Sequence, residues 1–184
     1  MNPNIPPSNQ NEPAKAASVI LVHGAFVDAS GWRPVYEILF RNGYEVLIVQ
    51  NPTVTLQGDV DAVRHAVAKA LNPVVLVGHS YGGAVITEAG NHGDVRALVY
   101  LAAFVPEAGE SVFDLASHEV PGAEPAPLLP PADGFIRVDP AKFPKAFAAD
   151  VDPAQTRFMA AAQVPWGLEA VQGKISTPAR PEKP

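Results

Sequence analysis

One serine of this sequence stands in a pattern that suits nucleophilic catalysis. Ser80 is the centre of "GHSYG", which matches G-x-S-x-G, and it follows the apolar run "VVLVGH" and precedes a helical pattern. On a tight turn between a strand and a helix, its hydroxyl would project above the sheet and could attack an acyl carbon. Gly78 and Gly82 suit such a turn because they have no Cβ where neighbouring chain passes close. His79 lies inside the motif, where we expect it to shape the turn.

A second motif could supply hydrogen-bond donors to the same reaction. The backbone N–H of Tyr81 would open the helix after Ser80, where unpaired donors and the helix dipole favour a developing oxyanion. The stretch "VHGAF" ends the first predicted strand, and the N–H of Ala25, after His23 and Gly24, is the candidate partner donor. Each such donor lowers the barrier by roughly 3 kcal/mol. His23 is expected to support the loop rather than act as a base.

Four apolar runs must position these residues. The runs are rich in Val, Ile and Leu without polar alternation, as strands covered on both faces should be, and they span residues 18–24, 44–50, 73–79 and 95–104. Apolar residues at helical spacing lie between the first and second runs, between the second and third, and at about 81–90. The alternation predicts an α/β three-layer sandwich with a mostly parallel sheet.

The remaining segments differ in composition. "MNPNIPPSNQNEPAKAA" is polar and lacks the apolar middle of a signal peptide, which favours a disordered lead-in and a cytoplasmic protein. After about residue 105 the chain is dense in proline, with two expected helices at 140–149 and 153–163. The ending "STPARPEKP" predicts a frayed tail. The expected divisions are lead-in 1–17, core 18–105, cap 106–166 and tail 167–184.

Composition excludes several classes of function. The net charge is −6 and no Lys/Arg cluster is present, which argues against nucleic acid and anionic membrane surfaces as partners. The longest apolar run, "ALVYLAAFV", is too short to span a membrane. Cysteine is absent, so disulfides and thiolate metal sites are excluded, and we expect no metal site.

Three quoted stretches resemble one superfamily. "VILVHGAFVDASGWRPVYEIL", "NPVVLVGHSYGGAVI" and "VRALVYLAAFVPEAGES" are similar to the α/β-hydrolase superfamily, especially its small bacterial members that are similar to plant methyl esterases and hydroxynitrile lyases. The resemblance covers about residues 18–175. It implies a nucleophile at Ser80, oxyanion donors at Ala25 and Tyr81, a cap over the site from about 106 to 166, and no cofactor.

The rest of a catalytic triad is harder to find. Superfamily order is Ser, then an acid, then His on loops after later strands, but no further Val/Ile-rich run follows 95–104 and no histidine follows His118. Two more strand–helix units would add about 60 residues, so the sheet is expected to lack its last strands and the chain to be C-terminally shortened. Asp114 and His118 have the right order to substitute, although a base must come within about 3 Å of the hydroxyl. Glu107 could occupy an acid position.

The cap is rich in large apolar side chains. They predict a lid that favours a small, hydrophobic, ester-like substrate, and any that face water would favour a homo-oligomer. The large apolar residues at or beyond the fourth apolar run are Phe104, which ends that run, and Phe113, Phe135, Phe143, Phe147, Phe158, Met159 and Trp166.

The sequence therefore predicts a serine esterase by lineage whose catalytic histidine and acid are not in this chain. Without them, only about a thousandfold acceleration over water would remain. Two alternatives stay open. One is a hydroxynitrile-lyase-like enzyme, and the other is a non-catalytic binding protein that keeps the pocket.

Overall fold

A four-stranded parallel sheet forms the centre of the computed structural model, which describes residues 16–118, 121–122 and 124–184. Its strands are β1 (Ser18–Val22), β2 (Glu45–Val49), β3 (Val74–His79) and β4 (Val95–Leu101), in the order β2-β1-β3-β4. Each strand falls within one of the predicted runs. The predicted lead-in 1–17 lies outside the described residues, apart from residues 16 and 17.

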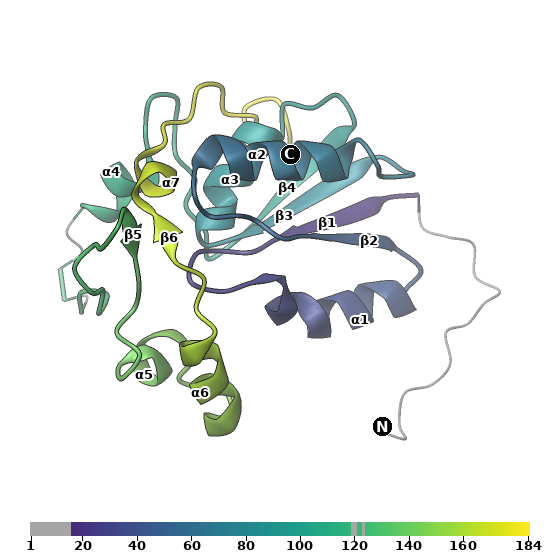
Figure 1. Ribbon diagram of the computed structural model, residues 1–184. Helices are drawn as coiled ribbons and strands as arrows, with labels where there is room; N and C mark the ends of the chain where they lie inside the picture. The colour runs from purple at the N-terminus through teal and green to yellow at the C-terminus, as the bar shows by residue number, and fades with distance from the viewer. Residues whose placement is uncertain (1–15, 119–120, 123) are drawn as a thin grey trace, which may run out of the picture.

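Helices cover both faces of this sheet (Figure 1). The 3-10 helix η1 (Ala29–Trp32) and α1 (Arg33–Arg41) lie on one face, and α2 (Leu56–Val67) and α3 (Tyr81–Ala89) lie on the other. Side chains alternate along β1, so Ile20 joins the core beneath α2 and α3 while Leu21 packs with Trp32 on the opposite face. The predicted three-layer α/β sandwich is confirmed.

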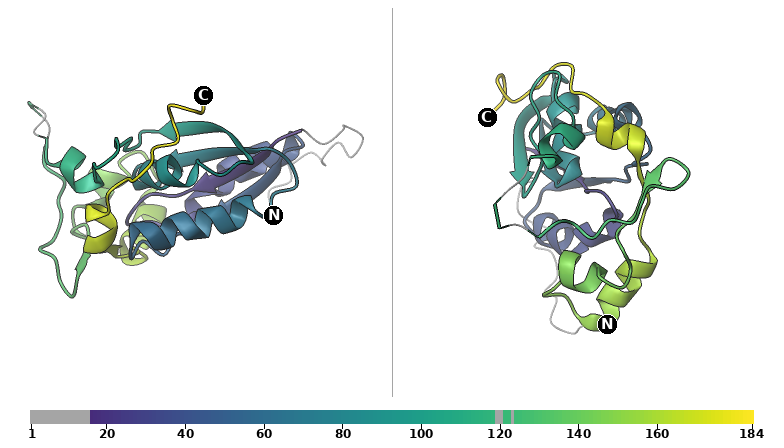
Figure 2. Two further views of the ribbon diagram at one scale, coloured as in Figure 1. Left: turned by 90° about the horizontal axis from the view of Figure 1, so that it is seen from above. Right: turned by 90° about the vertical axis from the view of Figure 1, so that its left-hand side faces the viewer.

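The chain after β4 contains mostly short elements, and those between residues 124 and 167 gather at the end of the sheet where the strands finish (Figure 1 and Figure 2). The elements that follow β4 are α4 (Val112–Ala116), β5 (Phe135–Ile136), α5 (Phe143–Phe147), α6 (Pro153–Ala161), β6 (Trp166–Gly167) and α7 (Leu168–Gln172). The helices predicted at 140–149 and 153–163 correspond to α5 and α6. Asp152 caps α6 by accepting hydrogen bonds from two backbone amides.

The prediction of a frayed ending is wrong. Ile175 and Ala179 are fully buried in the core. The Ala179 N–H donates to the Thr87 carbonyl oxygen at 2.8 Å, and the Glu88 carboxylate accepts from the Ser176 N–H at 2.8 Å. The polar and proline-rich composition of the ending concealed Ala179, which is buried in the core and bonds to the backbone of α3.

Candidate active site

Backbone strain is concentrated just after the carboxyl ends of the four strands. Five non-glycine residues of the described chain have positive φ, and four of them follow β1, β2, β3 and β4 in turn. These four are Phe26, Thr53, Ser80 and Ala102. Such conformations persist only where surrounding structure holds them, and open α/β sheets bind ligands at this edge. This edge is therefore the candidate active site.

Ser80 occupies the sharp turn between β3 and α3. Its φ of 52° and ψ of −124° are unusual for a residue with a side chain. Three backbone hydrogen bonds hold it there: its N–H donates to Leu101 O at 3.3 Å, and its carbonyl accepts from Gly83 N–H at 3.0 Å and Phe104 N–H at 3.1 Å. The residue remains partly exposed. The turn thus fixes the backbone while leaving the serine accessible.

Two glycines allow the chain to pack tightly around this turn. A Cβ on Gly78 would lie 2.6 Å from the Gly82 carbonyl oxygen, and a Cβ on Gly24 would lie 2.8 Å from the Ser80 Cβ. Real Cβ atoms do not approach so closely. The structure therefore brings the loop after β1 against the serine turn, so the two sequence motifs form one site.

The two candidate oxyanion donors are on Tyr81, which directly follows Ser80, and on Ala25, which follows the Gly24 that packs against Ser80. Tyr81 is the first residue of α3, so its N–H has no acceptor within the helix and lies at the positive end of the helix dipole. Ala25 is buried in the loop after β1, and Phe26 follows it with a φ of 66°. The loop therefore departs from regular backbone at the point where the second donor is expected.

The two histidines of the motifs, His23 and His79, contact neighbouring residues of the fold. His23 Nδ1 donates to the Gly24 carbonyl oxygen at 2.8 Å, while its Nε2 accepts the Asn51 N–H at 2.9 Å. Both ring nitrogens are occupied, so His23 is not placed to accept a proton from Ser80. The His79 ring packs edge-on against Trp32, with centroids 6.5 Å apart. Burial lowers the pKa of His23 and of His79.

His23 should make the protein less stable in mild acid. The pKa of His23 in the folded protein lies below the ordinary 6.5. Below pH 6.5 the unfolded chain therefore binds more protons at this residue than the folded protein does. The contribution of His23 to the free energy of unfolding is thus complete above pH 6.5 and is lost as the pH falls. The slope reaches at most about 1.4 kcal/mol per pH unit for one group. Urea unfolding at about pH 7.5 and about pH 5.5 should show a smaller loss in His23→Gln than in wild type. An equal loss in both proteins would contradict this role for His23.

The residues predicted as possible triad substitutes are Asp114, His118 and Glu107. Asp114 caps α4, where its carboxylate accepts from both the N–H (2.9 Å) and the hydroxyl (2.8 Å) of Ser111. These bonds lower the pKa of Asp114. His118 is exposed in the turn after α4, and Glu107 forms an ion pair with Arg180. None of the three forms a hydrogen bond with Ser80 in the described chain.

Asp59, in the first turn of α2, is a buried carboxylate close to this site. Its side chain is fully buried, and Oδ2 accepts the Tyr81 hydroxyl at 2.5 Å. Burial raises the pKa of Asp59 and of Tyr81. A signal existed, because Asp59 occupies the helical stripe formed by Leu56, Val60 and Val63, where an apolar residue is expected.

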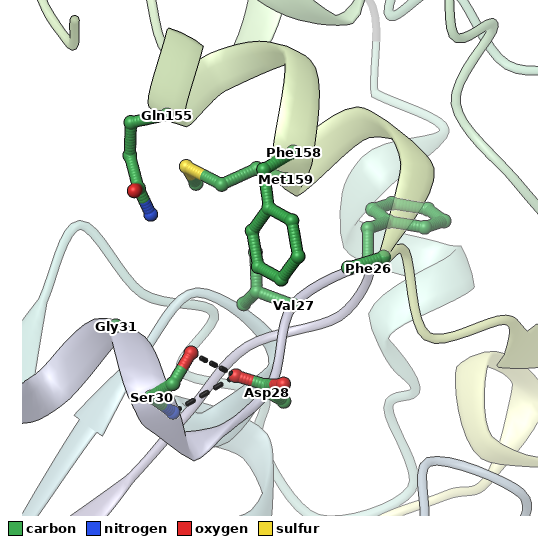
Figure 3. Close-up of a pocket in the computed structure, with 9 residues that line it drawn as sticks. Phe26, Val27, Asp28, Ser30, Gly31, Gln155, Phe158 and Met159 are labelled. Carbon is green, nitrogen blue, oxygen red and sulfur yellow. Dashed lines mark hydrogen bonds between the residues drawn. The ribbon is translucent and has the colours of Figure 1, made fainter.

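A small cavity of about 80 Å³ lies between α6 and the loop after β1 (Figure 3). Phe158 and Met159 of α6 face Val27 and Asp28 across it. Asp28 is engaged with Ser30, whose N–H donates to it at 2.8 Å and whose hydroxyl lowers its pKa. The cavity wall is thus largely apolar and adjoins the segment that carries Ala25.

The described residues contain neither a cluster of metal-ligating side chains nor a membrane-spanning helix. No group of three or more His, Cys, Asp or Glu side chains is arranged there to hold a metal ion. No helix in the same residues has the length and apolar character needed to cross a membrane.

The fold is that of an α/β hydrolase. Residues 19–182 match the model of the alpha/beta hydrolase family, and the chain belongs to that family.

Comparison with individual proteins agrees with this assignment. A carbendazim-hydrolysing esterase of Nocardioides sp. (strain SG-4G) is 36% identical over 119 residues, which cover 57% of this chain and 49% of the esterase. The chain spans about half the length of the curated relatives it matches.

Solved structures show the same fold. An extracellular α/β-hydrolase from a Paenibacillus species has a TM-score of 0.71 at 21% identity, covering 88% of this chain and 71% of that chain. A pyrethroid hydrolase from Sphingobium faniae has a TM-score of 0.69 at 20% identity, covering 89% of this chain and 74% of that chain.

Proposed function

We propose that Ser80 is the nucleophile of a carboxylic-ester hydrolase. The observation that carries the proposal is the strained Ser80 turn, held by three backbone hydrogen bonds and pressed against the loop of Gly24 at the carboxyl edge of the sheet. The esterase name of the Nocardioides relative supports ester hydrolysis as the reaction.

In this mechanism the Ser80 hydroxyl oxygen attacks the acyl carbon and loses its proton to a base. The carbonyl oxygen becomes an oxyanion, which the N–H groups of Ala25 and Tyr81 stabilise. The alkoxide then leaves with a proton, and water hydrolyses the acyl-serine by the same steps. Because the ring nitrogens of His23 are both engaged and His118 lies on an exposed turn, we propose that neither of these two histidines acts as this base.

The cap, residues 106–166, would set the substrate class. The cavity beside the loop after β1, which Ser80 itself does not line, has Phe158, Met159 and Phe26 in its wall. We infer a small, uncharged, hydrophobic acyl or alcohol part in the ester.

Chemical rescue by imidazole tests this proposal. Wild-type protein is treated with a fluorophosphonate, with and without added imidazole, and the adduct is located by peptide mass spectrometry. The expected result is an adduct on Ser80 that forms faster with imidazole, because imidazole supplies the missing general base.

Two control variants make the result decisive. Ser80→Ala should form no adduct under either condition. His118→Ala should be labelled as fast as wild type, whereas a loss of labelling would show that His118 is the base. An unlabelled wild-type Ser80 in the presence of imidazole would refute the proposed nucleophile.

A further inference from the structure

Thr53 connects two distant parts of the candidate site. Its N–H donates to Asp59 Oδ1 at 2.7 Å, and its carbonyl accepts the Gly167 N–H at 2.8 Å. Its hydroxyl lies 2.8 Å from the Pro52 carbonyl oxygen and 3.0 Å from that of Pro165. Thr53 has a φ of 56°, which is a genuine outlier for a β-branched residue. The bonds to Asp59 and to the cap therefore hold it in a strained conformation.

Residues 165–167, here termed the cap strap, end the cap and rejoin the core at Thr53. A Cβ on Gly167 would lie only 2.2 Å from the Val54 carbonyl oxygen, so the strap is pressed directly onto the backbone after β2. The Trp166 ring packs on Tyr81, with centroids 5.2 Å apart, and on Phe26, with centroids 5.6 Å apart. The strap thus contacts Tyr81, which carries one candidate oxyanion donor, and Phe26, which follows the other candidate donor, Ala25.

Asp59 ties this strap to Tyr81. One carboxylate oxygen accepts from Thr53 and the other from the Tyr81 hydroxyl, and within the described residues Asp59 has no ion-pair partner. An unpaired buried carboxylate is costly compared with an apolar residue of similar volume. Its presence on the buried stripe of α2 is therefore not explained by stability.

We propose that Asp59 is a positioning residue for the oxyanion site, which fixes the Tyr81 backbone N–H and the cap strap in one arrangement. Tyr81 is held at three places: its backbone in the first turn of α3, its ring by Trp166, and its hydroxyl by Asp59. Releasing the hydroxyl frees the side chain to reorient the peptide between Ser80 and Tyr81. This inference rests on the proposed function, in which that N–H stabilises the oxyanion.

Two substitutions at this position separate geometry from charge. In Asp59→Asn the amide oxygen can accept the Thr53 N–H, and the amide nitrogen can donate to the Tyr81 oxygen, so both links survive. In Asp59→Leu both links are lost, while the side chain keeps the same branched arrangement of four heavy atoms. Tyr81→Phe removes only the link to Tyr81 and serves as the test if the leucine variant does not fold.

The test measures the rate of Ser80 phosphonylation with imidazole, at a temperature where circular dichroism shows each variant folded. Asp59→Leu should slow labelling by about tenfold, since a misplaced oxyanion donor loses part of its effect. Tyr81→Phe should slow it less, and Asp59→Asn should be labelled at nearly the wild-type rate. Asp61→Leu is the matched control, because Asp61 lies on the same helix but is exposed, and its carboxylate accepts a hydrogen bond from the Gln57 side chain.

A second measurement keeps this inference separate from the proposed function. In 1H–15N spectra, the Tyr81 amide signal should move in Asp59→Leu and stay close to its wild-type position in Asp59→Asn. If wild-type Ser80 is never labelled, the nucleophile proposal fails, yet the amide signal still reports on positioning. Equal effects of the Asn and Leu changes, or an unmoved Tyr81 signal in folded Asp59→Leu, would overturn the role of Asp59.

Discussion

Replacing Gly82 with alanine is expected to destabilise the protein by about 2 kcal/mol and to slow Ser80 labelling at least about tenfold. Gly82 is the second residue of α3, and a Cβ there would lie 2.6 Å from the Val22 carbonyl oxygen and 2.8 Å from that of His23. Alanine is favoured over glycine within a helix by roughly 1 kcal/mol. The clash outweighs this gain, because both opposing atoms belong to backbone that the sheet and the loop after β1 hold in place.

The effect on labelling follows from the same contact. Pushing α3 away from β1 separates the Tyr81 amide from the loop of Ala25, and misplacement by about 1 Å can cost a hundredfold in rate. Urea unfolding and fluorophosphonate labelling measure the two effects. Gly93→Ala is the matched control, since a Cβ there meets nothing within 4 Å, and its stability should change by less than about 0.5 kcal/mol. Similar behaviour of the two variants would show that the close approach of α3 and β1 is not restrictive.

Replacing Phe143 with alanine is expected to lower the free energy of unfolding by about 3–5 kcal/mol. Phe143 begins α5, is fully buried, and stacks on Phe147 with ring centroids 4.6 Å apart. Phe147 in turn packs edge-on against Phe26 of the loop after β1. Truncation would leave a cavity where the cap meets the core, and a packed interior relaxes only partly around such a cavity.

Phe158 provides a control of the same residue type within the cap. Its side chain is 65% exposed on α6, so Phe158→Ala should change stability by less than about 0.5 kcal/mol. Urea unfolding followed by circular dichroism compares the two variants. Comparable losses in both would mean that α5 does not join the cap to the core as the contacts indicate.

Local patterns in the sequence were sufficient to predict the α/β architecture and the position of the turn that carries Ser80. The four apolar runs predicted β1 to β4 because a buried parallel strand needs apolar residues on both faces. Ser80 could be located because the turn from strand to helix needs glycines at fixed distances from it, as the contacts of Gly78 now illustrate. These requirements act over a few residues, so they leave a readable pattern.

The cap and the ending were harder to predict. Elements as short as α4 and β5 contain too few residues for a period to emerge. The burial of Ala179 depends on α3, whose Thr87 carbonyl oxygen accepts the Ala179 N–H, and Ile175 is held by backbone bonds to residues 109 and 110. Composition alone described that segment as polar, since it does not record which few side chains turn inward.

The sequence by itself determined the four strands, the helices between them and the place of Ser80. Only the tertiary structure decided that His23 uses both ring nitrogens, that Asp59 binds a tyrosine 22 positions away, and that Thr53 meets the cap at Pro165, 112 positions away. The physical reason is that strand and turn formation depends on neighbours along the chain, whereas a hydrogen bond between distant residues is specified only when folding brings its two partners together.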